Sequence, residues 1–166
     1  MYDIAICDDS AQDRSTLKDN FEQLCTIIPE WKWVELKIGL EKSIISSQDV
    51  KVYAIQVLSE SIDKYDIVLE LSIANEDEVW TILDKLCFSE EQEEEKILNK
   101  WIFAIIYYVY TYDRDRVFEI IEETYVEFNY FRQIENLIPY MPCEDGRTME
   151  ERLEKFIRDG KEMYSK

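Results

Sequence analysis

The segment Ile97–Val109 reads ILNKWIFAIIYYV, and it decides the fold class of this chain. Apolar side chains occupy nearly every position of the segment, so a helix with 3.6 residues per turn would be apolar on almost all sides. A helix of this kind is buried at the centre of a helical assembly. The longest apolar stretch, Trp101–Tyr112, is too short to cross a bilayer, which takes about 20 apolar residues. We therefore predict an all-α protein with this helix at its centre.

Helical periodicity continues on both sides of the central segment. Residues 50–58 place apolar side chains at the i, i+3, i+4, i+7 and i+8 spacing of an amphipathic helix. Helices are predicted over residues 10–25, from Pro29, from Ser46 or Ser47, over 63–73, from Asn75, from Ser89, over 114–128, and from Thr148 to about Gly160. Short turns between neighbours favour antiparallel pairs, arranged as a multi-helix bundle or as a short α-α solenoid.

Residues 1–27 are predicted to be an N-terminal extension, with a short strand at residues 2–7, followed by a helical domain over residues 28–166. Met1–Leu24 resembles the start of a response-regulator receiver domain, in which the first strand ends at an acidic pair that binds magnesium. Asp8 and Asp9 occupy this position. The window 50–60 contains no Asp to accept a phosphate, so we favour a helix-capping role for the pair and leave metal binding open.

The charge of the chain restricts its partners. The 166 residues include 19 Lys and Arg against 37 Asp and Glu, which gives a net charge of −18. A surface of this sign repels phosphate, which argues against binding to nucleic acid or to an anionic membrane and favours a basic protein partner.

The composition also removes several kinds of catalytic site. The chain has no His, which excludes Ser-His-Asp and Cys-His catalysis and the HExxH zinc site. It has 3 Gly and no glycine-rich phosphate loop. We therefore expect a non-catalytic protein that uses no cofactor and no metal.

The four cysteines, Cys7, Cys25, Cys87 and Cys143, form no CxxC pair. Disulfides between distant cysteines are an alternative, but the N-terminus has no secretory signal pattern. We therefore expect reduced thiols and a cytoplasmic protein. The acidic run over residues 90–95 lacks the spacing of a calcium loop, so a solvated helix N-terminus is the favoured interpretation.

Acidic residues gather around the predicted helix 114–128. The predicted inward residues are Val117, Ile120, Ile121, Thr124, Tyr125 and Phe128, and this stripe turns most of the glutamates to the opposite side. The candidate partner-binding residues are Asp113, Asp115, Glu119, Glu122, Glu123, Glu127, Glu144 and Asp145. The 11 Tyr and 4 Trp of the chain add the residue types that anchor protein interfaces. A plain solvated helix face is the alternative interpretation.

Five segments, taken in order, resemble one bacterial family. They are WVELKIGLEK at 33–42, IIS at 44–46, the Lys100-Trp101 helix with IYYVY at 106–110, IEETYVEFNY at 121–130 and IPYMPCEDG at 138–146. From about Ile28 onward the chain resembles domain-of-unknown-function family 2247, whereas residues 1–27 depart from that family's usual start.

The resemblance implies a helical protein with no assigned activity and no catalytic residues. Small acidic proteins of this kind often accompany bacterial polymorphic toxins. The implied function is therefore that of an immunity protein, which neutralises a cognate toxin, such as a nuclease, by binding it. A regulatory adaptor or nucleic-acid mimic that sequesters a basic protein is the alternative.

Overall fold

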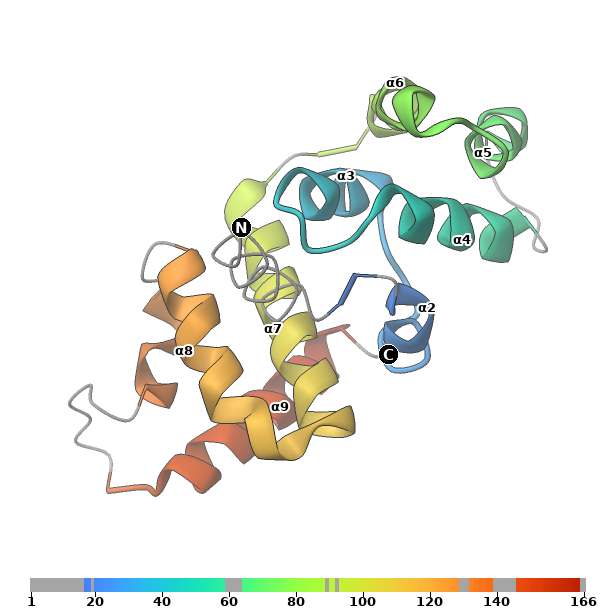
Figure 1. The fold of residues 1–166 in the computed structure, drawn as a ribbon. Coiled ribbons are helices and arrows are strands. Elements are labelled where there is room, and N and C mark those ends of the chain that lie inside the picture. The colour runs from blue at the N-terminus through green and yellow to red at the C-terminus, as the bar shows by residue number, and fades with distance from the viewer. Residues whose placement is uncertain are drawn as a thin grey trace, which may run out of the picture. The chain divides into compact units, whose positions relative to one another are not determined.

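The computed structural model describes residues 17–18, 20–58, 64–88, 90–91, 93–128, 132–138 and 146–164. Within these ranges the chain forms eight α-helices and two 3-10 helices and contains no strand (Figure 1). The predicted all-α fold is therefore confirmed. The candidate strand at residues 2–7, the Asp8-Asp9 pair and most of the helix predicted over 10–25 lie outside the described residues.

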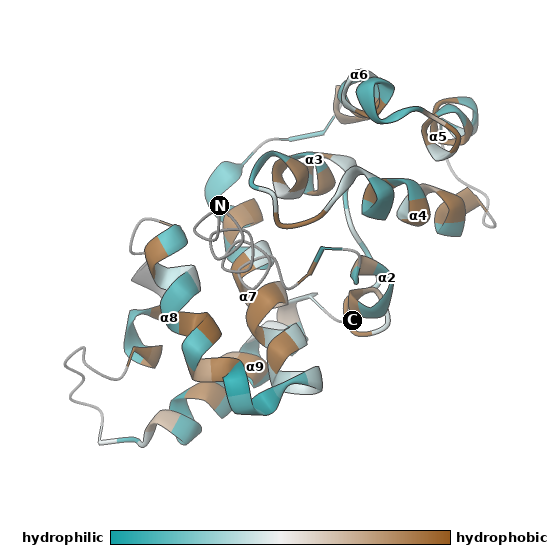
Figure 2. Cartoon of the chain, viewed as in Figure 1, coloured by the Kyte–Doolittle hydropathy of each residue, from teal (hydrophilic) through white to brown (hydrophobic). Residues whose placement is uncertain are grey.

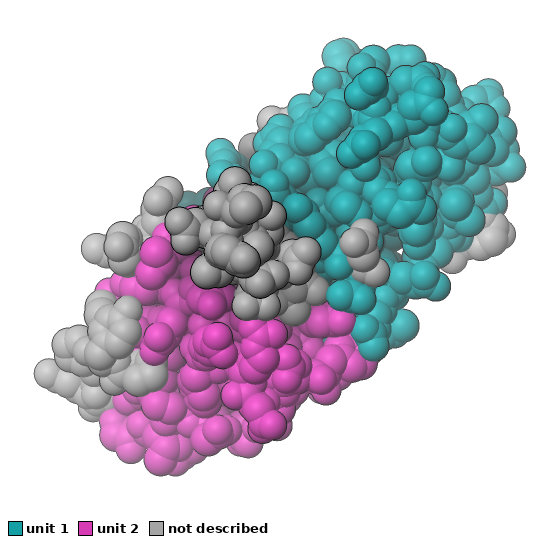
Figure 3. Space-filling view, viewed as in Figure 1, with its two compact units in different colours: residues 1–97 teal, residues 98–166 magenta. Residues whose placement is uncertain are grey.

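The chain divides into two compact units, Met1–Ile97 and Leu98–Lys166 (Figure 3). The first holds α2 (Phe21–Leu24), α3 (Trp33–Glu41), α4 (Ser47–Leu58), α5 (Tyr65–Ser72), α6 (Glu76–Cys87) and the first turn of α7 (Glu94–Tyr112). The second holds the rest of α7, then η1 (Arg114–Arg116), α8 (Val117–Glu127), η2 (Arg132–Leu137) and α9 (Met149–Tyr164). The domain boundary predicted after residue 27 stays a prediction.

Amphipathic helices build the core of the first unit. α5 packs against both α4 and α6, α6 packs against α3, and α2 packs against α4. The helices carry apolar and polar residues side by side (Figure 2), and one apolar stripe of each helix faces inward. Val50, Val68, Leu71, Val79, Leu83 and Leu86 are fully buried. Burying each such side chain stabilises the fold by about 1.5–3 kcal/mol.

Short-range caps start two of these helices as predicted. The Ser46 N–H donates to Asp49 Oδ2 at 2.9 Å, and the Asp49 N–H donates to Ser46 Oγ at 3.2 Å. This reciprocal pair is a capping box, and it identifies Ser46 rather than Ser47 as the cap. The Asn75 N–H donates to Glu78 Oε1 at 3.4 Å at the start of α6.

The helix predicted from Pro29 begins later, at Trp33. Residues before it are held by another contact, because the Tyr53 hydroxyl accepts from Trp31 N–H at 3.2 Å and donates to Trp31 C=O at 3.0 Å. The start of α3 is then completed by Glu90, whose Oε1 accepts from Val34 N–H at 2.7 Å and Oε2 from Trp33 N–H at 3.4 Å.

The same contact explains why α7 begins at Glu94 and not at Ser89 as predicted. Glu90 is bound to α3, so the acidic run begins as a connection and not as a helix. The first helical hydrogen bond of α7 joins Ile97 N–H to Glu93 C=O at 3.1 Å. Glu94 and Glu95 lie in the first turn, where the helix dipole favours negative charge.

In the second unit, α7 is buried on most sides, as its sequence predicts. Trp101, Phe103, Ile106 and Val109 are all buried. The Phe103 ring lies 5.2 Å from the Tyr107 ring and contacts Phe156 and Tyr164 of α9 at 5.7 and 5.4 Å between centroids. This aromatic cluster joins α7 to α9.

The last helix was predicted to end near Gly160, and this is wrong because α9 continues to Tyr164. Gly160 lies inside the helix at a close approach to another element. A Cβ at this position would overlap the Phe103 ring. The glycine therefore permits the contact between α7 and α9 and does not end the helix.

Candidate partner-binding surface

The inward face of α8 fixes which of its acidic residues reach solvent. The buried residues of the helix are Val117, Ile120, Ile121, Thr124 and Tyr125, all of which the sequence placed inward. Glu119 and Glu127 are exposed, whereas Glu122 and Glu123 are half-buried, and the Oε2 atom of Glu123 is buried. Glu119 and Glu127 are therefore the glutamates of α8 that are most accessible from solvent.

Arg116 brings two of the predicted residues together. Its Nη1 lies 3.5 Å from Asp113 Oδ2, and its Nε lies 3.7 Å from Glu119 Oε2. The guanidinium therefore holds both carboxylates at the start of α8 and offsets part of their charge. Exposed ion pairs of this kind contribute about 0–1 kcal/mol each, so they orient the side chains more than they stabilise the fold. Asp115, between the two arginines, is exposed.

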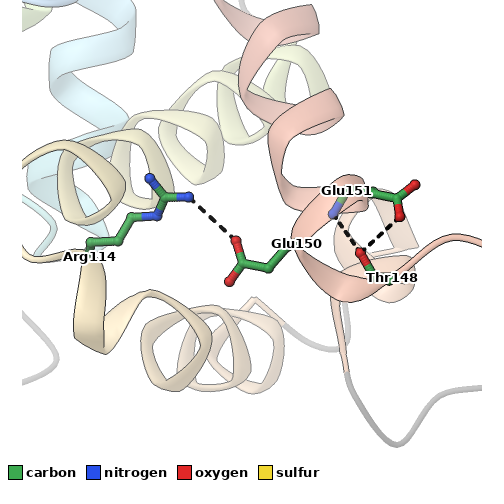
Figure 4. Close-up of polar contacts among 4 residues, drawn as sticks. All are labelled: Arg114, Thr148, Glu150 and Glu151. Carbon is green, nitrogen blue, oxygen red and sulfur yellow. Dashed lines mark hydrogen bonds and ion pairs between the residues drawn. The ribbon is translucent and has the colours of Figure 1, made fainter.

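Arg114 joins η1 to the first turn of α9 (Figure 4). Its Nη2 lies 3.4 Å from Glu150 Oε2, and its guanidinium carbon lies 4.0 Å from the centroid of the Tyr110 ring. A cation over an aromatic face adds attraction in this geometry. The contact fixes the segment that carries Asp113 and Asp115.

Thr148 caps α9, as the sequence predicts. Its Oγ1 accepts from Glu151 N–H at 3.1 Å and lies 3.2 Å from Glu151 Oε1, to which it donates (Figure 4). The cap places Glu150 in the first turn of the helix, next to Arg114. The sequence did not indicate the pairing with Arg114, because 36 residues separate the two partners.

Sequence reasoning also missed Val126. This side chain is 52% exposed, and it follows Glu122 by four residues and Glu123 by three, so it lies among the carboxylates of α8. Its exposure could have been predicted, because position 126 lies outside the inward apolar stripe of α8. An apolar side chain surrounded by charge resembles the centre and rim of a protein interface. We call Asp113, Asp115, Glu119, Glu122, Glu123, Val126 and Glu127 the α8 surface. Glu144 and Asp145 lie outside the described residues.

The described residues were also compared with the requirements of a metal site, a reactive thiol and a membrane-spanning helix. No group of three or more Cys, Asp or Glu converges to hold a metal ion within the part of the chain that the structure describes. Burial, and next the nearby Glu90, raise the pKa of the Cys87 thiol to about 12. That thiol is protonated at neutral pH and is a poor nucleophile. None of the described helices has the length and apolar character needed to cross a membrane.

The comparisons with known proteins identify the family. A family model described as "Uncharacterized protein conserved in bacteria (DUF2247)" matches residues 21–161. The match begins at Phe21 rather than at Ile28 and therefore includes α2. No curated protein and no solved structure matches the chain. Because the family model covers most of its length, this chain belongs to the bacterial DUF2247 family.

Proposed function

We propose that this protein is a non-catalytic acidic binding protein that neutralises a cognate bacterial toxin by direct contact, as an immunity protein. The observation that carries the proposal is the α8 surface, where the exposed Glu119 and Glu127 and the half-buried Glu122 and Glu123 lie on the same helix as an exposed valine. Both arginines of the neighbouring turn contact carboxylates, Arg114 that of Glu150 and Arg116 those of Asp113 and Glu119. The surface therefore presents mainly negative charge to a partner.

The chemistry of a basic partner fits this surface. A toxin that cleaves nucleic acid has a basic cleft for phosphates, and fixed carboxylates occupy such a cleft by the same attraction. The net charge of −18 accelerates the encounter by long-range steering. Val126 supplies an exposed apolar contact near the C-terminal end of α8, beside Glu127.

The test is the association rate with the toxin from a neighbouring reading frame. The variant Glu119→Lys with Glu127→Lys reverses the two exposed glutamates of α8. The control, Glu154→Lys with Glu162→Lys, makes the same change of charge at exposed positions of α9. We expect the α8 variant to associate about tenfold more slowly at low salt, with a flatter salt dependence, and the control to change little.

Two outcomes would count against the α8 surface. One is a wild-type association rate that is equal at low and high salt, since steering is screened by ions. The other is an equal loss in the α8 variant and in the α9 control, since net charge alone would then explain the effect.

The acidic residues also favour a second candidate, a nucleic-acid mimic that sequesters a basic protein. Carboxylates are not confined to α8, because the first turns of α6, α7 and α9 carry them as well. A mimic would bind several DNA-binding proteins and be displaced by DNA. An immunity protein would bind one toxin and protect against it.

A further inference from the structure

The outer side of α5 exposes a row of large apolar side chains. Tyr65, Leu69 and Ile73 are 48%, 42% and 77% exposed, and their four-residue spacing places them one above another along the helix and its C-cap. The core side of α5 is a different one, formed by Val68 and Leu71. Among the described residues, no other helix exposes three large apolar side chains at this spacing. Packing of the hydrophobic core therefore does not explain why these three exposed positions carry apolar side chains.

Carboxylates border the row. Asp66 and Glu70 each follow a member of the row by one position, so they lie next to it around the helix, and both are exposed. Asp77 follows shortly after Ile73 in the first turn of α6 and is also exposed. On α5 the carboxylates lie on one side of the row, because its other side is the buried one that carries Val68 and Ser72. An apolar row with an acidic border on one side complements a helix whose apolar row is bordered by Lys or Arg side chains.

We propose that the α5 row, meaning Tyr65, Leu69 and Ile73, docks a basic amphipathic helix of a partner protein. The proposal rests on the proposed function, because it assumes that the chain binds a basic protein, and it adds a second surface and the form of the partner segment. Tyr is among the residues that dominate binding energy at interfaces. The acidic border selects for basic residues along the side of the partner's apolar row that faces it.

Charge also decides against a second copy of this chain as the occupant. Two copies meeting at the α5 row would bring their Asp66 and Glu70 carboxylates towards one another. Like charges in an interface oppose association. Each copy also carries a net charge of −18.

The start of α5 is anchored before any partner arrives. Lys64 precedes the helix with a left-handed backbone at φ 60°. Its Nζ donates to the Leu86 carbonyl of α6 at 3.3 Å. Further along α5, Glu70 lies 4.0 Å from Lys85 of α6, an exposed pair that adds little stability and offsets part of the Glu70 charge. A surface that is already held in place loses less conformational entropy on binding.

The experiment is a titration of the full chain with a helical peptide of about 18 Leu and Lys residues, five turns long, with leucines along one side. Affinity is measured by calorimetry, and the contact site by amide NMR shifts. The variant is Leu69→Ser with Ile73→Ser. The control is Ile55→Ser with Met163→Ser, which removes two exposed apolar side chains elsewhere. We expect shifts centred on α5 and an affinity about tenfold lower for the variant, with little change for the control.

A second peptide has the same composition but scrambled leucines, so it keeps the positive charge and lacks the apolar row. Comparing the two peptides distinguishes attraction to charge from docking of an apolar row. Equal binding of both peptides would overturn the proposal, because attraction to net charge alone would explain it. Shifts scattered over the chain, or an unchanged affinity in the α5 variant, would also overturn it. So would sedimentation that shows a dimer which dissociates in the variant, because the occupant would then be a second copy.

A rescue assay with the same variant separates this proposal from the proposed function. If the wild type protects against no toxin while the peptide docks on α5, toxin neutralisation fails and the docking site stands. If the wild type protects and the α5 variant protects equally, neutralisation stands and the docking proposal fails for that partner.

Discussion

Gly160 occupies the position in α9 where the ring of Phe103 leaves no space for a Cβ. The ring is itself fixed by Tyr107, Phe156 and Tyr164. Ala is better than Gly in a helix interior by about 1 kcal/mol, but a crowded methyl group in a packed cluster costs about 1–3 kcal/mol. We expect Gly160→Ala to lower the free energy of unfolding by up to about 2 kcal/mol in urea denaturation. Glu162→Ala, at an exposed position of α9, is the control. A more stable Gly160→Ala variant would contradict the packing account.

The raised pKa values of Tyr53 and Cys87 lead us to expect that the stability of the fold depends on pH in the alkaline range. Burial raises the pKa of its phenol to about 12, although the hydrogen bond to Trp31 lowers it, and burial raises the pKa of Cys87 to about 12 as well. The unfolded groups ionise from their ordinary values of 10.0 and 9.0. Their contribution is therefore complete below about pH 9 and is lost as the pH rises towards 12.

We expect the free energy of unfolding to fall over this alkaline range, and the fall to be shallower in Tyr53→Phe with Cys87→Ala. At neutral pH, Tyr53→Phe alone should cost about 1–3 kcal/mol, because the Trp31 N–H and C=O lose their partner. Urea denaturation at a series of pH values measures both effects. If the free energy of unfolding falls equally steeply with pH in the wild type and in the double variant, ionisation of Tyr53 and Cys87 does not cause the fall.

The helix caps are the residue contacts that the sequence predicts best. The caps at Ser46, Asn75 and Thr148 each join residues three positions apart, so a short motif predicts them. Gly160 was read as a helix end because glycine commonly follows a last turn. Its actual role depends on Phe103, which is distant in the sequence.

At the scale of elements, Glu90 caps α3 from the connection between α6 and α7. Glu90→Gln keeps one oxygen acceptor but removes the negative charge from the helix N-terminus. We expect a loss of about 1 kcal/mol in the free energy of unfolding, with the neighbouring exposed Glu91→Gln nearly neutral. Because Glu90 helps to raise the pKa of Cys87, that pKa should also fall in the Glu90 variant, as followed by thiolate absorbance. An unchanged pKa would show that Glu90 does not lie beside Cys87 in solution.

The presence of each described α-helix could be predicted from the sequence, whereas the 3-10 helix η2 and several boundaries could not. α3 begins later than predicted because Tyr53, which is 22 residues away, holds the backbone of Trp31. α7 begins later because Glu90, which is 56 residues from Val34, binds α3 instead of extending α7. A pattern within one window contains no information about such a contact. The inward stripe of α8 was predicted residue by residue, yet the half-buried state of Glu122 and Glu123 depends on neighbouring elements.

At the scale of the whole molecule, a charge of −18 opposes the compact state through self-repulsion. We expect the melting temperature to rise by several degrees between about 0.02 and about 0.5 M NaCl, because salt screens this repulsion. The exposed ion pairs, such as Lys155 with Asp159 at 2.7 Å, weaken in salt but contribute little. Calorimetry in matched buffers measures the shift. A melting temperature that falls steadily with salt would show that ion pairs outweigh repulsion.

The candidate surfaces differ in how far the sequence predicted them. Charge and periodicity located the carboxylates of α8, but Val126 and the roles of Arg114 and Arg116 required the structure. The α5 row could not be predicted from the sequence, because residues 63–73 contain apolar side chains on two sides of the helix. Only the exposed fractions distinguish the row from Val68 and Leu71 in the core.

A survival assay tests the central claim most directly. Each reading frame beside this gene is induced in a sensitive bacterium, and survivors are counted with and without this protein. The account predicts that one frame kills, that this protein restores growth, and that Glu119→Lys with Glu127→Lys restores less than the control with the same charge change on α9. A lethal frame that this protein does not counteract, or the absence of any lethal frame, would contradict toxin neutralisation.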